Sequence, residues 1–177
     1  MIYIRTLNEN KITNIKNVLI DKFMLNDITE PATLPLKTGY VRLYHQTSEQ
    51  AFDNIKKENS IKLKHSTGKL NKEPVIIWGK VIKTPNDNGF YGSPKTHYTI
   101  EYQAPESDVV AGGLNRDVSG DDILAYHDPV LFIIQDLVNS DGYLNSIIED
   151  IDYFLNYKGN DAESKAYHLI ANTIKNL

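Results

Sequence analysis

Apolar residues recur at helical spacing in the first part of the chain. Between residues 11 and 24 they fall three and four positions apart, which is the spacing of one helical face and predicts an amphipathic helix. The apolar stretch that precedes it, residues 2–7 (IYIRTL), predicts a short strand. Pro31, Pro35 and Gly39 then mark a connector to the rest of the chain.

The same helical spacing returns in the last third. Asp128 followed by Pro129 is typical of the cap and first turn of a helix, and an apolar stripe follows it. A second amphipathic helix is predicted over residues 144–155. Asn160, with Glu163 three residues further on, has the spacing of a capping box and predicts the start of a third helix.

The middle of the chain shows the period of a strand instead. Strands are predicted at residues 40–45, 61–64, 74–82, 96–102 and 108–111. In the first of them, alternation places Val41, Leu43 and His45 on one face. The third, PVIIWGKVI, is apolar on both faces, as expected of a strand buried within a sheet.

Strands in the middle and helices at both ends indicate an α+β fold and exclude the regular alternation of a doubly wound parallel sheet. The length of 177 residues fits a single domain, because one core holds on the order of 100–200 residues. Within 1–177 we expect an N-terminal extension at 1–39, a sheet-rich core at 40–111 and a helical part at 119–177. A composition of 41% hydrophobic and 24% charged residues excludes wholesale disorder.

The composition also excludes several kinds of chemistry. The chain has no cysteine, which rules out disulfide scaffolds, cysteine nucleophiles and thiolate zinc sites. The five histidines lack zinc-binding spacing, so no metal site is expected, and the GxGxxG, P-loop and GxSxG motifs are absent. No signal peptide and no apolar run near the roughly 18 residues of a membrane span are seen, so we expect a cytoplasmic protein without a membrane partner.

The net charge is −4, from 19 basic and 23 acidic residues, which argues against broad electrostatic capture of a nucleic-acid backbone. Lysines do gather between residues 56 and 72. Because aromatic residues do not interleave with them, we interpret this group as a solvated basic surface.

The segment LYHQTS, residues 43–48, brings several polar groups together. His45 ends a predicted strand on its inward face, and Thr47 and Ser48 follow at the start of a short predicted helix that ends near Asn59. An imidazole, two hydroxyls and the free N–H groups of a helix start would form a polar pocket suited to a ribose and its phosphates. The alternative is that Thr47 and Ser48 only cap the helix and His45 is a hydrogen-bonded core residue.

With the short helix and strand after it, LYHQTS resembles the first motif of the ADP-ribosyltransferase superfamily in its histidine-first branch. THYTIEYQAPESDVVAGG (96–113) and DAESKAYHLIANTIKNL (161–177) are similar to anti-CRISPR members of that family encoded by phages. The resemblance covers roughly residues 40–177. It implies a split, mostly antiparallel sheet with an N-terminal helix and a C-terminal helical cluster, and NAD as the cofactor.

The resemblance also implies site residues. The group that would bind a ribose of NAD consists of His45, Gln46, Thr47 and Ser48. The family's second motif is an aromatic strand beside the nicotinamide, and either Trp78 or Tyr91 matches it here. The alternatives are a core tryptophan and an exposed turn tyrosine.

The third implied element is a carboxylate that stabilises the positive centre formed as nicotinamide leaves. Asp161 at the head of the last predicted helix matches it best, and Glu163 is the second choice. Both also fit a purely structural role, because acidic residues complement the dipole at a helix start. Asp121 and Asp122 are a further candidate pair, although they too are typical of a helix start.

The function implied is a mono-ADP-ribosyltransferase that uses NAD to modify a macromolecular target. The target would be a protein, such as a host defence complex, or a nucleic acid, reached by a phage or bacterial effector in the host cytoplasm. The alternative is a non-enzymatic inhibitor or binding protein that keeps the fold and blocks a partner through an acidic surface.

Two departures from the family pattern lead to one hypothesis. The sequence ends with the last predicted helix, where relatives continue into further strands, and residues 1–39 are additional. We expect the predicted strand at 2–7 to fill the vacant position in the sheet, close to residues 74–82.

Overall fold

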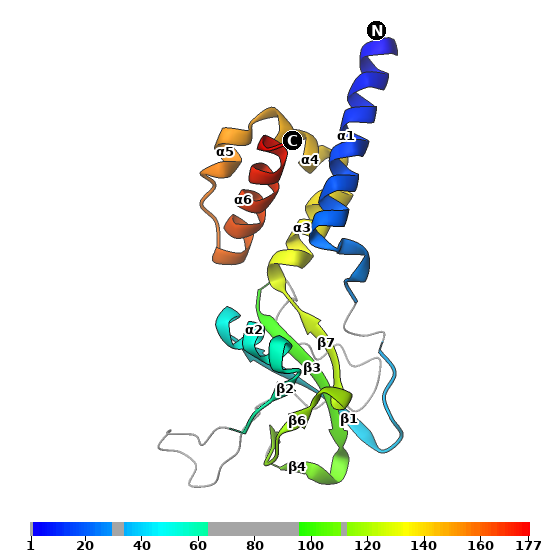
Figure 1. Cartoon of the computed structure of the whole chain (residues 1–177), viewed down its shortest axis with the longest axis vertical. Coiled ribbons are helices and arrows are strands. Elements are labelled where there is room, and N and C mark those ends of the chain that lie inside the picture. The colour runs from blue at the N-terminus through cyan, green and yellow to red at the C-terminus, as the bar shows by residue number, and fades with distance from the viewer. Residues whose placement is uncertain (1, 30–33, 64–95, 111–112) are drawn as a thin grey trace. The chain divides into compact units, whose positions relative to one another are not determined.

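A computed structural model of the protein describes residues 2–29, 34–63, 96–110 and 113–177. The fold is α+β, with helices towards both ends of the chain and antiparallel strands between them (Figure 1). The predicted fold class, with its N-terminal helix and C-terminal helical cluster, is confirmed. The chain divides into two compact units: a helical unit of residues 1–28 and 129–177, and a sheet unit of residues 29–128.

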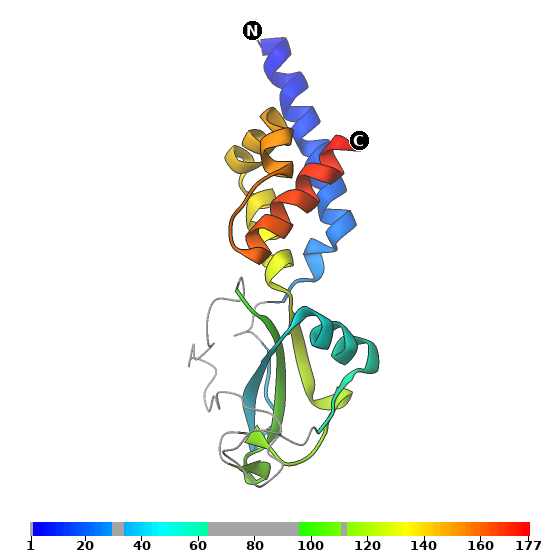
Figure 2. The same cartoon turned by 90° about the vertical axis from the view of Figure 1, so that its left-hand side faces the viewer.

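The helical unit is a cluster of packed helices. Its members are α1 (Ile2–Phe23), α3 (Pro129–Asn139), α4 (Asp141–Glu149), α5 (Ile151–Leu155) and α6 (Asp161–Lys175), with a 3-10 turn η1 at Leu25–Asp27. Helix α6 packs against α3, α4 and α5, and α1 lies alongside α3, α4 and α6 (Figure 2). Their fully buried side chains include Leu19, Ile134, Leu144, Ile147 and Ile170. None of the described helices combines the length and apolar character needed to cross a lipid bilayer.

Residues 2–7 are helical, so the strand predicted there is wrong. Helix α1 runs without interruption from Ile2 to Phe23. A short apolar stretch does not distinguish strand from helix, and neither glycine nor proline separates it from the helix predicted at residues 11–24. The hypothesis that a strand at 2–7 fills a vacant sheet position is therefore wrong as well. Its expected neighbour, residues 74–82, lies outside the described residues.

The single helix predicted over residues 144–155 is divided into α4 and α5. Asp150 separates them, because its Oδ1 accepts a hydrogen bond from the backbone N–H of Tyr153 at 3.2 Å and so caps α5. Short acidic side chains compete for backbone N–H groups in this way, which favours helix ends over helix interiors. The apolar spacing continues across the break and does not reveal it.

The sheet unit is built on three antiparallel strands in the order β1-β3-β7. They are β1 (Tyr40–Thr47), β3 (Tyr98–Pro105) and β7 (Ile123–His127), and helix α2 (Glu49–Glu58) follows β1. Two small antiparallel ladders join β2 (Ser60–Ile61) to β6 (Val118–Ser119) and β4 (Val109–Val110) to β5 (Gly113–Leu114). The 3-10 turns are η3 (Glu106–Asp108) and η4 (Gly120–Asp122).

The two faces of the sheet bury different chemistry. On one face, Phe52 of α2 packs with Val41, Leu43, Ile100 and Tyr102 in an apolar core. On the opposite face, the alternating positions hold Arg42, Glu101 and His127, each at most 1% exposed. The alternation predicted for the strand at residues 40–45 is confirmed, and the face of the sheet that carries the polar residues is buried too.

Strand β7 lies in the stretch that the sequence assigns to the helical part, residues 119–177. Asp121 and Asp122 do not start a helix of that part. They form η4, after which residues 123–127 pair with β3. The sequence ILAYH carries no clear strand period, so its pairing depends on β3 and not on a local pattern. The prediction of helix for this stretch is wrong, and the C-terminal helices begin at Pro129.

Candidate functional site

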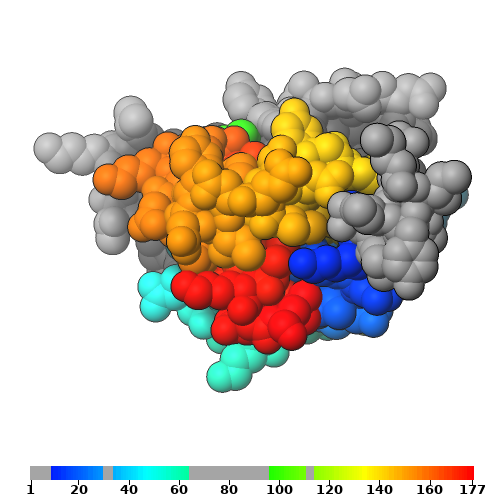
Figure 3. Space-filling view, turned by 90° about the horizontal axis from the view of Figure 1, so that it is seen from above, coloured from blue at the N-terminus to red at the C-terminus, as the bar shows by residue number. Residues whose placement is uncertain are grey.

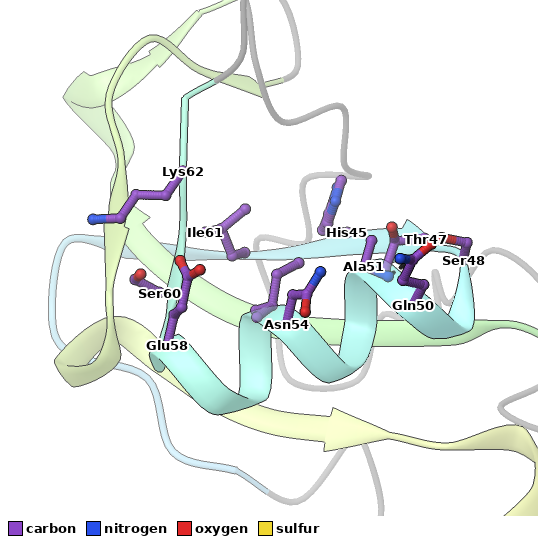
Figure 4. A pocket seen from close by; sticks show the side chains of 11 residues that line it. His45, Thr47, Ser48, Gln50, Ala51, Asn54, Glu58, Ser60, Ile61 and Lys62 are labelled. Atoms are coloured by element: carbon purple, nitrogen blue, oxygen red, sulfur yellow. Dashed lines mark hydrogen bonds between the residues drawn. The ribbon is translucent and has the colours of Figure 1, made fainter.

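A pocket of about 510 Å³ opens in the sheet unit between the end of β1, one side of α2 and the segment that follows α2 (Figure 4). We call it the His45 pocket. It is lined by His45, Thr47, Ser48, Gln50, Ala51, Asn54, Ile55, Glu58, Ser60, Ile61 and Lys62. Its volume falls within the range of roughly 300–1,000 Å³ that small-molecule sites occupy.

The local sequence explains why the end of β1 and the start of α2 lie at the pocket. The strand ends at Thr47, and Ser48 takes an extended conformation as the N-cap of α2, with its Oγ accepting from the backbone N–H of Ala51 at 3.4 Å. The predicted capping role of Ser48 is confirmed. As an acceptor in the cap, the Ser48 oxygen still has a hydroxyl proton to donate to a ligand. The N-terminus of α2, which favours negative charge, thus opens at the pocket.

The other end of α2 is fixed by Asn59. This residue is the C-cap in the left-handed conformation (φ 48°), and its backbone N–H bonds the carbonyls of Ile55 and Lys56. The Asn59 Oδ1 accepts a hydrogen bond from the Tyr126 hydroxyl at 3.0 Å. A Cβ on Gly120 would lie 3.0 Å from the Asn59 carbonyl oxygen and closer still to its side chain. Contacts from β7 and η4 therefore hold the turn that brings β2 back beside α2.

His45 lies at the strand end of this pocket. It pairs with Ile100 of β3, and alternation puts it on the face of β1 that also carries Val41 and Leu43. Those two residues belong to the apolar core under α2, whereas the half-buried His45 reaches the pocket wall beyond that core. The predicted inward orientation of His45 is confirmed.

One face of α2 supplies much of the wall. Asn54, Ile55 and Glu58 lie three, four and seven residues after Ala51, which is the spacing of one helical face, and all four residues line the pocket. Figure 4 labels Ala51, Asn54 and Glu58 among them. The sequence reading did not name Asn54, Glu58 or Gln50 as site residues. The helical spacing of α2 contained part of that information, because Gln50, Asn54 and Glu58 lie on the side of the helix turned away from the buried Phe52.

Lys62 brings a positive charge to the far side of the pocket. Its Nζ lies 3.5 Å from Asp117 Oδ2, and both side chains are about half exposed. The Asp117 Oδ1 also accepts from the backbone N–H of Leu63 at 2.6 Å. The ammonium is thus held near the pocket by a carboxylate that water screens, which leaves it able to pair with an anionic ligand.

The predicted site residues do not all meet. His45, Thr47 and Ser48 line one pocket, whereas Gln46 is not among its lining residues, since alternation turns it to the other face of β1. Trp78 and Tyr91 lie outside the described residues. Asp122 of η4 forms an ion pair with Lys37 at 3.2 Å, and Asp121 is exposed.

Asp161 and Glu163 belong to the helical unit, at the start of α6. The Asn160 Oδ1 accepts from the Glu163 backbone N–H at 2.9 Å, so the predicted cap is confirmed. The Glu163 carboxylate accepts a hydrogen bond from the Tyr157 hydroxyl; burial and this carboxylate raise the pKa of Tyr157. The carboxylate that the described part of the His45 pocket contains is Glu58. Within the described residues, no group of three or more His, Asp or Glu side chains is arranged to hold a metal ion.

Behind the pocket, the opposite face of the sheet is fixed by a buried ionic cluster. Glu101, which is 0% exposed, places Oε1 2.9 Å from Arg42 Nε and Oε2 2.9 Å from His127 Nε2. Arg42 also donates to the carbonyl of Leu34. Burial and the Glu101 carboxylate raise the pKa of Tyr44 to about 12. The three strands are thus joined by a buried network of Arg42, Glu101 and His127, and Arg42 lies three residues from His45 in β1.

No protein-family model matches the chain, and neither a curated protein nor a solved structure matches it at a significant level. The link to ADP-ribosyltransferases therefore depends on the motif resemblance, and the function has to be argued from the His45 pocket.

Proposed function

We propose that the protein is an NAD-dependent mono-ADP-ribosyltransferase that binds NAD in the His45 pocket. The observation that supports this most directly is that His45, Thr47 and Ser48, three residues of the LYHQTS motif, line a single pocket of about 510 Å³. The alternative, in which Thr47 and Ser48 only cap the helix and His45 is a core residue, does not account for the pocket that these three residues share.

The chemistry of the lining fits the parts of a dinucleotide. The His45 imidazole and the hydroxyls of Thr47 and Ser48 suit ribose hydroxyl groups, which both donate and accept hydrogen bonds. The N-terminus of α2 and the Lys62 ammonium suit the pyrophosphate. Ala51, Ile55 and Ile61 offer apolar surface against which a base or the nicotinamide ring packs.

The reaction is a substitution at one carbon of the ribose. The bond between C1′ and the nicotinamide nitrogen breaks, and its electron pair leaves with nicotinamide. The nucleophilic atom of the target then bonds to C1′ and loses its proton. The protein has to hold the bent dinucleotide and stabilise positive charge on the ribose, which is positioning and electrostatics. Glu58 is placed in the His45 pocket for the second task, and Asp161 and Glu163 stay candidates from the family resemblance.

A thermal-shift experiment tests NAD binding. We expect about 1 mM NAD to raise the Tm of the protein by about 3 °C, because a ligand that binds only the folded state stabilises it by mass action. The His45→Ala variant should lose this shift. The matched control is His97→Ala, which removes an exposed histidine of the same unit that does not line the pocket.

Measuring the release of nicotinamide distinguishes a transferase from an NAD hydrolase and from a non-enzymatic binding protein. Release that requires an added protein or nucleic acid supports transfer to a target, whereas release by the protein alone indicates NAD hydrolysis. The absence of both a thermal shift and release would contradict the proposal and favour the non-enzymatic binding protein. Measured with Glu58→Gln, Asp161→Asn and Glu163→Gln, release also identifies the carboxylate that the reaction needs.

The proposed setting follows from the same resemblance. We place the activity in the cytoplasm of a host cell, where NAD is supplied and where a phage or bacterial effector meets a defence complex or a nucleic acid. Modification of such a target by labelled NAD in a host lysate, lost in His45→Ala, is the corresponding observation.

A further inference from the structure

Four aromatic rings gather on one surface of the helical unit. They are Tyr153 and Phe154 of α5, Tyr157 after it and Tyr167 of α6, and we call them the aromatic patch. Phe154 and Tyr167 are stacked at 4.9 Å between ring centroids, and Tyr157 and Tyr167 lie 4.5 Å apart. Tyr153 meets Phe154 edge-on at 5.0 Å. The patch is therefore a continuous group of rings held by mutual contact.

The patch is not part of the interior of the helical unit. Tyr153 is 57% exposed, and Tyr143 of α4 is 60% exposed. The buried interior consists mainly of aliphatic residues from α1, α3, α4 and α6. In the space-filling view, α4 and α5 (yellow to orange) form one outer surface beside α6 (red) (Figure 3). Phe154, Tyr157 and Tyr167 are half-buried, and grouped aromatic residues that reach the surface in this way are typical of interaction sites.

Carboxylates lie beside part of the aromatic patch. Glu163 accepts from the Tyr157 hydroxyl within it. Asp152 precedes Tyr153 in α5, and a shallow recess at the junction of α4 and α5 is lined by three carboxylates, Glu149, Asp150 and Asp152, and by one cation, Lys175. Residues 129–177 carry seven acidic side chains against three lysines and no arginine. The surface thus combines aromatic ring faces with excess negative charge.

We infer that the aromatic patch and the carboxylates of α5 and α6 dock an arginine-rich segment of a partner protein. A guanidinium group stacks on aromatic faces and pairs with a carboxylate through two parallel N–H groups, so it uses both features at once. The bases of a nucleic acid could stack on the aromatic rings, but its phosphates would be repelled by the carboxylates of Glu163 and Asp152.

A second copy of this chain does not supply such a segment. Its three arginines are scattered at positions 5, 42 and 116. Arg42 is buried, and Arg116 is paired with Asp108 at 2.9 Å. The inference does not depend on the proposed function, because its test uses Tyr153 and Asp152 of the helical unit, and neither is a candidate residue of the proposed reaction.

Fluorescence polarisation with the full-length protein tests the inference. The probes are short labelled peptides of alternating arginine and glycine, lysine and glycine, and glutamate and glycine, together with a single-stranded RNA of mixed sequence. We expect the arginine peptide to bind about threefold or more tighter than the lysine peptide, and the glutamate peptide and the RNA not to bind.

Variants locate the binding. Tyr153→Ala should weaken arginine-peptide binding about threefold to tenfold, Tyr153→Phe should largely keep it, and Asp152→Asn should weaken it about threefold. Asp121→Asn in the sheet unit and Met24→Ala, which removes another exposed apolar side chain, are the matched controls and should bind as the wild type. Unchanged melting of each variant shows that it is folded, as expected for exposed positions.

Three results would overturn the inference. The first is no peptide binding by the wild type at millimolar concentration. The second is equal loss of binding in Asp121→Asn and Asp152→Asn, with arginine and lysine peptides bound alike, which would show that net charge alone attracts them. The third is RNA binding that Tyr153→Ala abolishes, which would make the patch a nucleic-acid surface.

Discussion

Glu101 connects the three strands of the sheet through charge. It is fully buried between Arg42 of β1 and His127 of β7, with 2.9 Å contacts to both. Removing one partner of a buried ion pair leaves the other without compensation in a medium of low dielectric constant. We therefore expect Glu101→Gln, which keeps the shape and removes the charge, to lower the free energy of unfolding by about 3 kcal/mol or more.

Urea unfolding followed by circular dichroism measures this effect. The control is Asp141→Asn, which breaks the more exposed Lys16–Asp141 pair and should cost less than about 1 kcal/mol. Equal destabilisation by the two variants would show that the buried cluster contributes no more than a surface ion pair.

Tyr44 makes the stability of the folded protein depend on pH in the alkaline range. In the unfolded chain its pKa is near the ordinary tyrosine value of 10.0, and in the folded protein burial and the Glu101 carboxylate raise the pKa to about 12. Below pH 10 the hydroxyl is protonated in both states. As the pH rises from 10 towards 12 the unfolded state loses the proton first, so stability decreases across this window.

The Tyr44→Phe variant checks this prediction. It should lose less stability than the wild type between pH 10 and pH 12, while Tyr143→Phe, which removes an exposed hydroxyl, should follow the wild type. Thermal melting across this range is the measurement. Parallel curves for Tyr44→Phe and the wild type would contradict it.

At the scale of single residues, the sequence predicted the part of the site that one motif encodes. His45 and Ser48 are where alternation and capping preferences placed them. Glu58 and Lys62 were missed because their roles depend on the turn at Asn59, which brings β2 back beside α2. That turn is fixed by Tyr126 and Gly120, and neither contact has a signal in the local sequence.

At the scale of elements, α6 shows that a capping sequence has a structural role of its own. Asn160 accepts from the Glu163 backbone N–H at 2.9 Å. We expect Asn160→Ala to lower the free energy of unfolding by about 1 kcal/mol, whereas Asn160→Asp should be nearly neutral because Asp caps equally well. Chemical unfolding of the two variants is the check. Loss of nicotinamide release by Asn160→Ala without destabilisation would instead point to a catalytic role for this helix start.

The two elements that the sequence pattern predicted wrongly, at residues 2–7 and at β7, share one physical reason for the error. The helix starts at Glu49, Pro129 and Asp161, each preceded by a typical capping residue in the sequence, were predicted closely. The errors fall where a local pattern fits two structures: the apolar stretch at 2–7 and strand β7. In both, tertiary packing decides between helix and strand, and a short apolar stretch carries no information about its packing partner.

At the scale of the whole molecule, the two units carry different proposed activities. The His45 pocket lies in the sheet unit, and the aromatic patch lies in the helical unit. The composition of residues 129–177 is acidic, while the pocket contains Lys62 and a helix N-terminus. An effector that binds NAD with one unit and its target with the other would need this division of charge, since the dinucleotide and an arginine-rich segment require opposite potentials.

Calorimetric titration with NAD tests the central claim most directly, because it measures binding whether or not a target is present. The wild type and His97→Ala should bind NAD with the same affinity, and His45→Ala should bind it about tenfold or more weakly, as expected when a ribose contact in the pocket is lost. Tyr153→Ala, in the other unit, should bind NAD as the wild type does. Equal binding by His45→Ala and the wild type, or no heat of binding with any of them, would contradict the account.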